Sequence, residues 1–338
     1  MGFPVGRVYD AYGPAWLLRI GSFLVVFGLM MASLSTKYYQ LLLSQAVVFG
    51  IGASMVFFPV ITATSTWFFK KRALAIGLAS VGSSMGGIIQ PIMITNLIPQ
   101  IGFGWTMRTI AFMFLGLLVI ANLGVKSRLP PRGGSVPKIS EITAVLTDKD
   151  WALLTAGYFI FVWGMFTPFT YIPDYGLYYG MSQHLSIYLV SILNAGSVFG
   201  RTIPAGLGDR FGRFNVFTLM SFFSGIITLA MWIPSRSHAV IIAYSALFGF
   251  SSGAFVSLGP ACIAQISDIR QLGLRVGVCF AIFAIAALTG VPIAGALLGH
   301  NNNWVHVQIW AGVTMIAGSS IMLFLRFKLA GYKLMVKV

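Results

Sequence analysis

The sequence predicts an all-α protein that crosses a membrane many times, and three observations lead to this fold class. The first is composition: 57% of the 338 residues are hydrophobic, only 9% are charged, and the mean hydropathy is +0.87. A water-soluble domain has about 25% charged residues. The second is that long stretches contain no Asp, Glu, Lys or Arg, the longest running from 276 to 325. The third is the uneven distribution of basic residues between the two sides of the predicted spans.

We expect ten transmembrane helices, because a bilayer core of about 30 Å requires about 20 helical residues. The stretch from 276 to 325 is about twice that length and contains the polar run from His300 to Asn303, so it is divided into two spans. The short stretches at 20–36 and 109–125 are extended into their flanks. The predicted spans are 15–35, 40–64, 74–98, 105–125, 151–173, 184–207, 214–233, 239–263, 274–298 and 304–326.

The basic residues predict the orientation. With these spans, 19 of the 22 Lys and Arg residues lie on one side, and only Lys37, Arg108 and Arg236 lie on the other. The positive-inside rule places the larger set, and both termini, in the cytoplasm. We expect the plasma membrane, with a vacuolar or other internal membrane as the alternative. The net charge of +15 is spread through short loops, which favours anchoring to an anionic inner leaflet over nucleic-acid binding.

One pattern occurs twice, at an offset of 199 residues. The aligned pairs include Asp10 with Asp209, Gly13 with Gly212, Ser22 with Ser221 and, one residue out of register, Gly77 with Gly277. A period this long indicates two half-molecules built on one plan, because solenoid repeats have periods of about 20 to 50 residues.

The polar segment 126–150 divides the chain into domains. We predict an incomplete N-terminal bundle of four spans at 1–125, a cytoplasmic central loop at 126–150, a C-terminal bundle of six spans at 151–327 and a cytoplasmic tail at 328–338. At the offset of 199 the counterpart of Trp151 would precede residue 1. We therefore expect the first two helices of the plan to be absent.

Two six-helix halves joined by a central loop, with a Gly-x-x-x-Asp-x-aromatic-Gly motif, resemble the major facilitator superfamily of transporters. The segment WFFKKRALAIGLASVGSSMGG at 67–87 resembles the start of the fifth helix in the monocarboxylate-transporter family. The segment NAGSVFGRTIPAGLGDRFGRFN at 194–215 resembles the eighth helix of its fungal members. On this mapping the ten spans are helices three to twelve of a twelve-helix plan.

The two copies of the glycine and aspartate motif are candidate gating motifs. Their glycines allow a tight turn at positive φ, and their aspartates can cap the next helix and pair with a nearby Arg. The resemblance implies that they govern the inward gate, while a simple turn cap explains the sequence equally well. The candidate gating residues are Gly6, Arg7, Asp10 and Gly13 in the first copy, and Asp209, Arg210, Gly212 and Arg213 in the second. The cytoplasmic basic cluster is Lys70, Lys71 and Arg72.

Arg201 is the principal candidate for substrate binding. It lies eight residues before Asp209, about 12 Å along a helix toward the middle of the bilayer. Asn194, Ser197 and Arg201 are spaced at i, i+3 and i+7, so they form one polar stripe on a helix. A charge inside a membrane usually faces a cavity or a partner, and the alternative is that Arg201 snorkels to the inner surface. The resemblance implies that this Arg binds the substrate carboxylate, whose planar geometry suits a guanidinium.

Gln90 is a further candidate for the substrate cavity, because it is polar and precedes Pro91 inside a span. Hydrogen bonding between helices explains it as well. Monocarboxylate transporters of the animal type carry an acid four residues before the matching Arg, and Ser197 stands there in this chain. A coupling proton is therefore left open.

Pairs of glycines four residues apart predict helices that approach closely. These pairs are Gly82 with Gly86, Gly196 with Gly200, and Gly249 with Gly253.

We predict a secondary active transporter of a small organic solute, a monocarboxylate or carboxylated metabolite, that works by alternating access. Its partners would be an organic anion and the lipid bilayer, without nucleic acid; the solute, the direction of transport and any accessory membrane protein are left open. The sequence lacks His-Glu-x-x-His, Cys-x-x-Cys and nucleotide-loop motifs, so we expect no enzyme activity, metal or cofactor. The alternative is a truncated or non-transporting membrane protein with a regulatory role or none.

Overall fold

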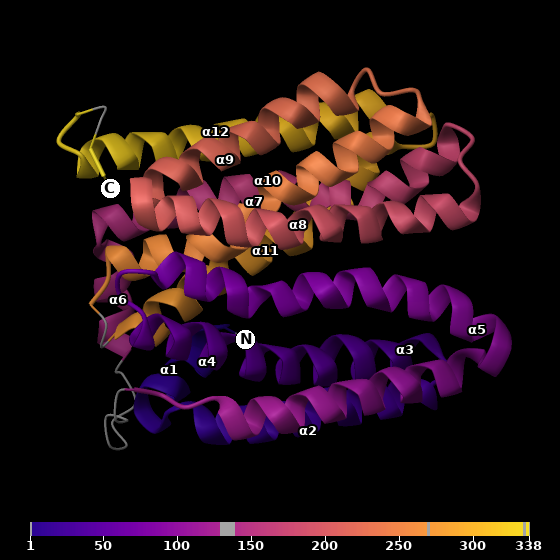
Figure 1. The fold of residues 1–338 in the computed structure, drawn as a ribbon, viewed down its shortest axis with the longest axis horizontal. Coiled ribbons are helices and arrows are strands. Elements are labelled where there is room, and N and C mark those ends of the chain that lie inside the picture. Colours follow the sequence, from indigo (N-terminus) through magenta and orange to yellow (C-terminus); the bar gives the residue numbers. More distant parts are fainter. Residues whose placement is uncertain (1, 129–138, 269–270, 334–335, 338) are drawn as a thin grey trace. The chain divides into compact units, whose positions relative to one another are not determined.

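The computed structural model of the chain describes residues 2–128, 139–268, 271–333 and 336–337. Within these residues the chain is helical and contains no strand (Figure 1). The elements are α1 (Gly2–Tyr12), α2 (Pro14–Ser33), α3 (Tyr38–Leu41), the π-helix η1 (Leu42–Val48), α4 (Phe49–Trp67), α5 (Arg72–Gly124), α6 (Ile139–Thr147), α7 (Lys149–Tyr178), α8 (Gln183–Phe211), α9 (Arg213–Ile227), the π-helix η2 (Thr228–Trp232), α10 (His238–Gln265), α11 (Leu272–Leu298) and α12 (Trp304–Leu329).

The predicted all-α membrane fold is confirmed, because every predicted span coincides with a helical segment. Among the described residues, eight helices are long and apolar enough to cross a membrane. The longest is α5, whose 53 residues would extend about 80 Å as one rod, far beyond a bilayer core of about 30 Å. Gly102 interrupts it with a φ of 76°, so α5 contains both predicted spans, 74–98 and 105–125.

The chain forms two compact units. Unit 1 consists of Met1–Phe69, Ile92–Ile142 and Ser267–Ala281, and unit 2 of Lys70–Pro91, Thr143–Ile266 and Ile282–Val338. These units cut across the predicted halves, since the first part of α5 belongs to unit 2 and the start of α11 to unit 1. The predicted division into two bundles remains a prediction. Residues 129–138 of the predicted central loop lie outside the described residues.

In unit 1, α2 packs against α4 through small residues. A methyl group on Gly52 of α4 would lie 2.7 Å from the Val25 amide nitrogen of α2, so only glycine permits this approach. The second part of α5 covers another side of α2. The core of this contact contains Leu29, Ala32, Met107, Ile110 and Ala111.

In unit 2, the predicted glycine contacts are confirmed between α8 and α10. A methyl on Gly253 would lie 2.8 Å from the Ser197 carbonyl oxygen, and one on Gly196 would lie 3.1 Å from the Phe250 amide nitrogen. The packing prediction is wrong for Gly82 and Gly86, because no described residue of another helix lies within 4 Å of a methyl built on either. An aromatic cluster lies in the core of this unit, where the rings of Tyr158, Phe161 and Phe217 each contact the ring of Phe255.

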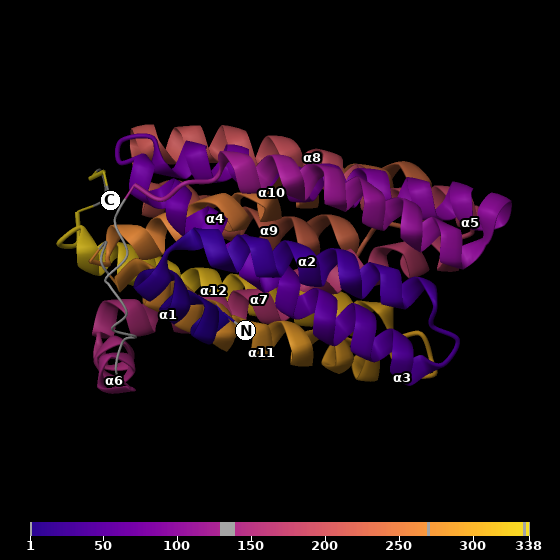
Figure 2. The ribbon, with the colours of Figure 1, turned by 90° about the horizontal axis from the view of Figure 1, so that it is seen from below.

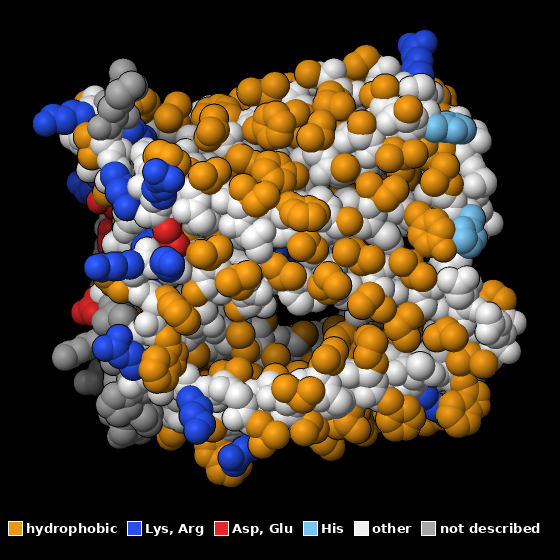
Figure 3. All heavy atoms as spheres, in the orientation of Figure 1, with side chains coloured by type: hydrophobic (Ala, Val, Ile, Leu, Met, Phe, Trp, Pro, Cys, Tyr) orange, Lys and Arg blue, Asp and Glu red, His pale blue; other side chains and the backbone are white. Residues whose placement is uncertain are grey.

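The surface has the composition expected of a protein in a bilayer. On the face shown in Figure 3, hydrophobic side chains cover the long sides of the helices, and Lys and Arg side chains gather mostly near one end. Many large apolar side chains are exposed on the described helices, among them Phe23, Leu123 and Leu288. Such a surface is stable in lipid rather than in water.

Candidate functional site

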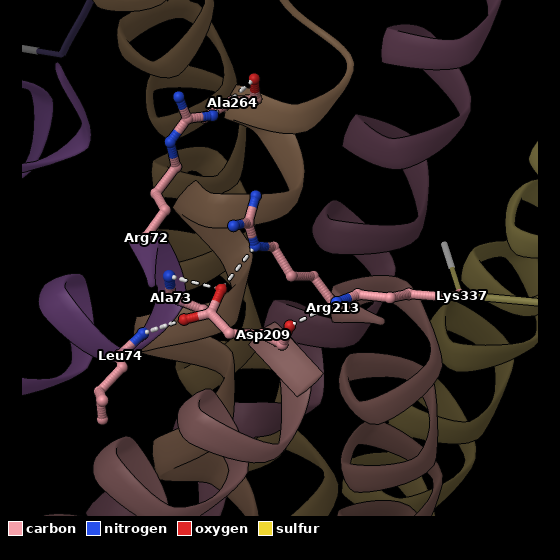
Figure 4. Close-up of polar contacts among 7 residues, drawn as sticks. All are labelled: Arg72, Ala73, Leu74, Asp209, Arg213, Ala264 and Lys337. Atoms are coloured by element: carbon pink, nitrogen blue, oxygen red, sulfur yellow. Dashed lines mark hydrogen bonds and ion pairs between the residues drawn. The ribbon is translucent and has the colours of Figure 1, made fainter. Parts of the chain in front are cut away.

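Asp209, near the end of α8, binds the first turn of α5 (Figure 4). Its Oδ2 accepts a hydrogen bond from the Leu74 amide at 2.9 Å, and its Oδ1 accepts one from the Ala73 amide at 3.2 Å. Oδ1 also pairs with Nε of Arg213 at 2.9 Å. The first amides of a helix lack partners within the helix and carry partial positive charge, so a carboxylate there caps the helix and neutralises its end. The predicted pairing of Asp209 with an arginine is confirmed.

The basic cluster of Lys70, Lys71 and Arg72 separates into two environments. Arg72 is buried, and its Nη1 donates to the Ala264 carbonyl oxygen at the end of α10 at 3.2 Å (Figure 4). A cation is favourable there because carbonyl groups at a helix C-terminus carry partial negative charge. Lys70 and Lys71 are exposed. Arg72 alone of the three therefore joins the Asp209 contact region.

The C-terminal tail contacts the same connection between α8 and α9. Nζ of Lys337 donates to the Asp209 carbonyl oxygen at 2.7 Å (Figure 4). Asn215 of α9 donates to the Val336 carbonyl oxygen at 2.9 Å and accepts a hydrogen bond from Nε of Arg326 at 2.7 Å. Arg326 is buried and also donates to the Lys333 carbonyl oxygen at 2.8 Å. The tail is thus held by side chains of α9 and α12.

Asp10 repeats the Asp209 contact inside unit 1. Its Oδ2 accepts a hydrogen bond from the Leu274 amide, in the first turn of α11, at 2.9 Å. The sequence offset that aligns Asp10 with Asp209 also brings Leu74 to within one residue of Leu274. The internal repeat is therefore a repeat of contacts as well as of residues.

The structure corrects two expectations for the gating motifs. Gly13 and Gly212 adopt positive φ values of 77° and 107° as predicted, but Gly6 lies inside α1 and contacts Gly273 closely. The aspartates do not cap the next helix: Gly13 and Gly212 occupy the N-cap positions of α2 and α9. The physical reason is that each aspartate lies in the last turn of its own helix and faces the start of a helix distant in sequence.

Two other arginines of the gating motifs, Arg210 and Arg7, have different surroundings from Arg213. Arg210 is exposed and lies over the ring of Phe211, with 5.4 Å between its Cζ and the ring centroid. Arg7 is half-buried on α1. The structure thus brings together Asp209 and Arg213 and leaves Arg210 outside that contact.

Arg201 lies on α8 and is only 8% exposed. Its Nε donates to Oγ of Ser197 at 3.2 Å. Its Nη1 donates to the Ser80 carbonyl oxygen and to Oγ of Ser83, both on α5. Its side chain is therefore directed at the neighbouring helix inside the protein. The alternative that Arg201 snorkels to the inner surface does not fit this position.

Close contact between α8 and the first part of α5 positions these groups (Figure 2). A methyl on Gly77 would collide with the Arg201 carbonyl oxygen and lie 3.2 Å from Cβ of Ala205. Nearer the other end, Oγ of Ser191 donates to the Ile88 carbonyl oxygen at 3.3 Å. Because the two backbones are so close, the Arg201 side chain reaches the α5 backbone directly.

The other predicted binding residues lie along this contact. Asn194 is buried, packs against Gly87 and donates to the Val190 carbonyl oxygen of its own helix at 2.9 Å. Gln90 is half-buried on α5 and forms no hydrogen bond with a described residue. The structure therefore brings Arg201 and Ser197 into contact and leaves Asn194 and Gln90 with separate neighbours.

The sequence reasoning missed the three serines of α5 beside this contact. Arg201 donates to the backbone carbonyl oxygen of Ser80 and to Oγ of Ser83, and Ser84 is fully buried with no hydrogen-bond partner for Oγ among the described residues. Three serines within five residues of an apolar span were a visible signal. Buried polar groups in a membrane require partners, so such serines indicate a polar contact.

The chain is similar to proteins of one transporter family. A sequence model of the Major Facilitator Superfamily matches residues 1–238. "MFS-type transporter 1" of Ophiocordyceps sp. is 47% identical over 338 residues, which cover 100% of this chain and 75% of the relative. The "Fujikurins efflux protein" of Gibberella fujikuroi is 46% identical and covers 96% of this chain and 70% of its own length.

Solved structures share the fold. The crystal structure of the transporter FucP in the outward conformation matches with a TM-score of 0.75 at 14% identity, covering 96% of this chain and 86% of that one. The human organic anion transporter MFSD10 matches with a TM-score of 0.75 at 15% identity, covering 96% of this chain and 79% of that one. At such low identity these matches establish the fold alone.

Proposed function

Because the chain belongs to the major facilitator superfamily, whose members move small organic solutes across membranes, we propose that it is a secondary active transporter that exports a carboxylated metabolite by alternating access. It is a multi-pass membrane protein. In this proposal Arg201 binds the carboxylate of the solute, and Asn194, Ser197 and Gln90 contact the rest of it. We further propose that both termini lie in the cytoplasm, at the plasma membrane.

The observation that carries the proposal is a buried guanidinium without a counter-ion. Arg201 forms no ion pair with a described Asp or Glu, and its Nη2 forms no hydrogen bond with a described residue. A buried charge costs several kcal/mol unless an opposite charge compensates it. A solute carboxylate would supply that charge and could accept hydrogen bonds in the geometry that a guanidinium favours.

The names of related proteins support export as the direction. Three relatives at 37% to 46% identity are named as efflux proteins, for fujikurins, agnestins and aspyridones. We propose that this chain likewise moves a fungal metabolite outward.

The Asp209 and Asp10 contacts support a role in the inward gate. Each holds the first turn of a helix distant in sequence by a charged hydrogen bond to its backbone. Breaking these contacts would free the cytoplasmic ends of α5 and α11. A helix cap contributes about 0.5 to 2 kcal/mol. This is enough to shift the balance between two conformations of the transporter and small enough to be lost during each transport cycle.

The surroundings of Arg201 argue against a proton carried beside it. Ser197 occupies the position where the resemblance would place an acid, and its hydroxyl accepts from Arg201. A serine hydroxyl does not ionise in the physiological range. We propose that any coupling ion binds elsewhere.

The test is a flux assay in proteoliposomes of defined orientation. A panel of carboxylic acids and their primary amides is measured with the native chain, with Arg201→Gln and with Arg236→Gln, a control that removes the same charge outside the site. We expect flux of at least one acid, its loss in Arg201→Gln and its retention in Arg236→Gln. Unchanged acid flux in Arg201→Gln would refute the carboxylate site, and a folded native chain that moves no solute would favour the non-transporting alternative.

A further inference from the structure

The guanidinium of Arg201 uses most of its hydrogen-bond donors within the protein. A guanidinium carries N–H groups on three nitrogens, one on Nε and two on each Nη. Nε donates to Oγ of Ser197 at 3.2 Å, and Nη1 donates both to the Ser80 carbonyl oxygen and to Oγ of Ser83. Among the described residues, none accepts a hydrogen bond from Nη2. The donors left for a solute are therefore on a single nitrogen.

This arrangement conflicts with the strongest way of binding a carboxylate. A guanidinium and a carboxylate form two parallel hydrogen bonds, which join two different nitrogens to the two oxygens. The nitrogen pairs that can do this are Nη1 with Nη2 and Nε with Nη2. Each pair contains one nitrogen that already donates to a serine of the protein. A carboxylate can therefore form both bonds with Arg201 only if an acceptor in the protein gives up its own.

Ser83 is the acceptor that is easiest to displace. The Ser80 acceptor is a backbone carbonyl oxygen, which the helix α5 fixes in place. Ser197 is held by the close approach of α10, where a methyl on Gly253 would lie 2.8 Å from Oγ of Ser197. Oγ of Ser83 is carried by one rotatable bond, so its hydroxyl can leave Nη1 by turning to another staggered position. Neither helix backbone has to move when it does so.

The close approach of α5 and α8 does not depend on this bond. In unit 1, α1 and α11 approach each other at glycines: a methyl on Gly2 would lie 2.6 Å from the Gly277 carbonyl oxygen. At the offset of 199, Gly2 occupies the position of Arg201. The repeat thus forms this type of contact without an arginine or a serine. A substitution of Ser83 should therefore leave α5 and α8 packed together.

We propose that Ser83 competes with the solute carboxylate for Nη1 of Arg201 and so lowers the affinity of the site. When a carboxylate binds, it takes Nη1 and Nη2 together, and the Ser83 hydroxyl turns away. When the solute leaves, the hydroxyl returns to Nη1, so the guanidinium is not left without this partner and release costs less. This inference rests on the proposed carboxylate site. Ser83 acts through Arg201 and is a positioning residue.

Equilibrium binding in nanodiscs tests the competition. The two probes are the carboxylic acid that gives the highest flux in the panel and its primary amide, and the proteins are the native chain and Ser83→Ala. Loss of the hydroxyl should raise the affinity for the acid about 3- to 10-fold, because one hydrogen bond to Nη1 no longer has to be broken. The affinity for the amide should stay within about twofold of the native value, because an amide has only one oxygen to accept from the guanidinium.

Two further variants separate the hydroxyl from other effects of the substitution. Ser83→Thr keeps a hydroxyl that can bond to the carbonyl oxygen three residues earlier, as Oγ of Ser83 does with the Ser80 carbonyl at 3.1 Å, so it should restore the native affinity. Ser84→Ala removes the neighbouring hydroxyl, which has no hydrogen-bond partner among the described residues, and should leave the affinity unchanged. An unchanged or lower acid affinity in Ser83→Ala, or an equal gain in Ser84→Ala, would overturn the proposal.

Arg201→Gln distinguishes failure of this inference from failure of the proposed function. If Arg201→Gln binds the acid as tightly as the native chain does, the carboxylate site itself is refuted, and the competition with it. If Arg201→Gln loses affinity for the acid while Ser83→Ala gains none, only the competition is refuted. A gain in Ser83→Ala that disappears in the double variant with Arg201→Gln is the expected result, because Ser83 acts on the solute through Arg201 alone.

Discussion

The carboxylate of Asp209 caps α5 by accepting a hydrogen bond from the Leu74 amide at 2.9 Å. Asp10 caps α11 through the Leu274 amide at the same distance. Both aspartates come from the repeated motif, and each binds a helix far from it in the sequence. Each contact holds the first turn of a helix, so it would break if that turn moved away from the aspartate.

Loss of the Asp209 cap should open the contact between α5 and α8. Asp209→Ala removes the acceptor of two backbone amides and the partner of Arg213, which should cost about 1 to 2 kcal/mol. The fraction of molecules in which the contact is open should therefore rise about 5- to 30-fold. The measurement is the labelling rate of Ser80→Cys by an impermeant thiol reagent added on the side of the membrane where Asp209 lies. Ser80 is buried beside Arg201, and the buried Cys262 and Cys279 are first replaced by alanine.

The control for this variant is Asp209→Asn, which keeps an acceptor oxygen but loses the charge. We expect a labelling rate between those of the native chain and Asp209→Ala. Equal labelling of all three proteins would show that the cap does not hold the contact closed.

A methyl group at Gly77 should force α5 away from α8. Gly77→Ala would collide with the Arg201 carbonyl oxygen, and overpacking of this kind costs about 1 to 3 kcal/mol. The matched control is Gly82→Ala on the same helix, where no described residue of another helix lies within 4 Å of the added methyl. Alanine favours a helix over glycine by up to about 1 kcal/mol, so the control should be neutral or stabilising. Thermal unfolding in nanodiscs checks both, and equal midpoints would contradict the observed closeness of the helices.

An acid beside Arg201 should block anion transport. Ser197→Asp would place a carboxylate next to the guanidinium, which now bonds to Oγ of Ser197 at 3.2 Å. That carboxylate would pair with the guanidinium and compete with the anionic group of the solute. Flux of the acid should therefore fall in Ser197→Asp.

Ser197→Asn is the neutral control for this prediction. It has nearly the shape of aspartate without the charge, so it should retain much more flux than Ser197→Asp. Similar losses in the two variants would mean that size, rather than charge, matters at this position.

Arg326 should stabilise the tail and the start of α9. Arg326→Ala would remove hydrogen bonds to Oδ1 of Asn215 and to the Lys333 carbonyl oxygen, and each bond to a charged donor contributes about 1.5 to 3 kcal/mol. Arg326→Lys should recover only part of the loss, because one ammonium cannot reproduce the guanidinium fork. Proteolysis of the tail gives the readout. Cleavage should be slowest in the native chain, faster in Arg326→Lys and fastest in Arg326→Ala. Identical cleavage rates would rule out this role.

The fold was largely predictable because a helix that crosses the bilayer core requires about 20 consecutive, mainly apolar residues. Charge-free stretches of sufficient length identified the spans, including the two that α5 joins at Gly102. The positive φ of Gly13 and Gly212 was also predictable, since a short turn between helices requires it. These features depend on residues close together in the chain.

The contacts between distant helices could not be predicted in the same way. The sequence placed Arg201 in a span but did not reveal that its partners would be Ser80 and Ser83. It predicted that Asp209 caps a helix but selected α9 instead of α5. Such pairings depend on how helices far apart in sequence pack, and local spacing carries no information about that packing.

The most direct test of the Arg201 proposal is a binding cycle that changes the protein and the ligand separately. Equilibrium affinities are measured for the native chain and Arg201→Gln with a carboxylic acid that the flux assay identifies and with its primary amide. We predict that Arg201→Gln lowers the affinity for the acid at least about tenfold more than the affinity for the amide. This difference corresponds to a coupling of about 1.4 kcal/mol between the guanidinium and the carboxylate. An equal loss for both ligands would contradict the claim that Arg201 binds the anionic group.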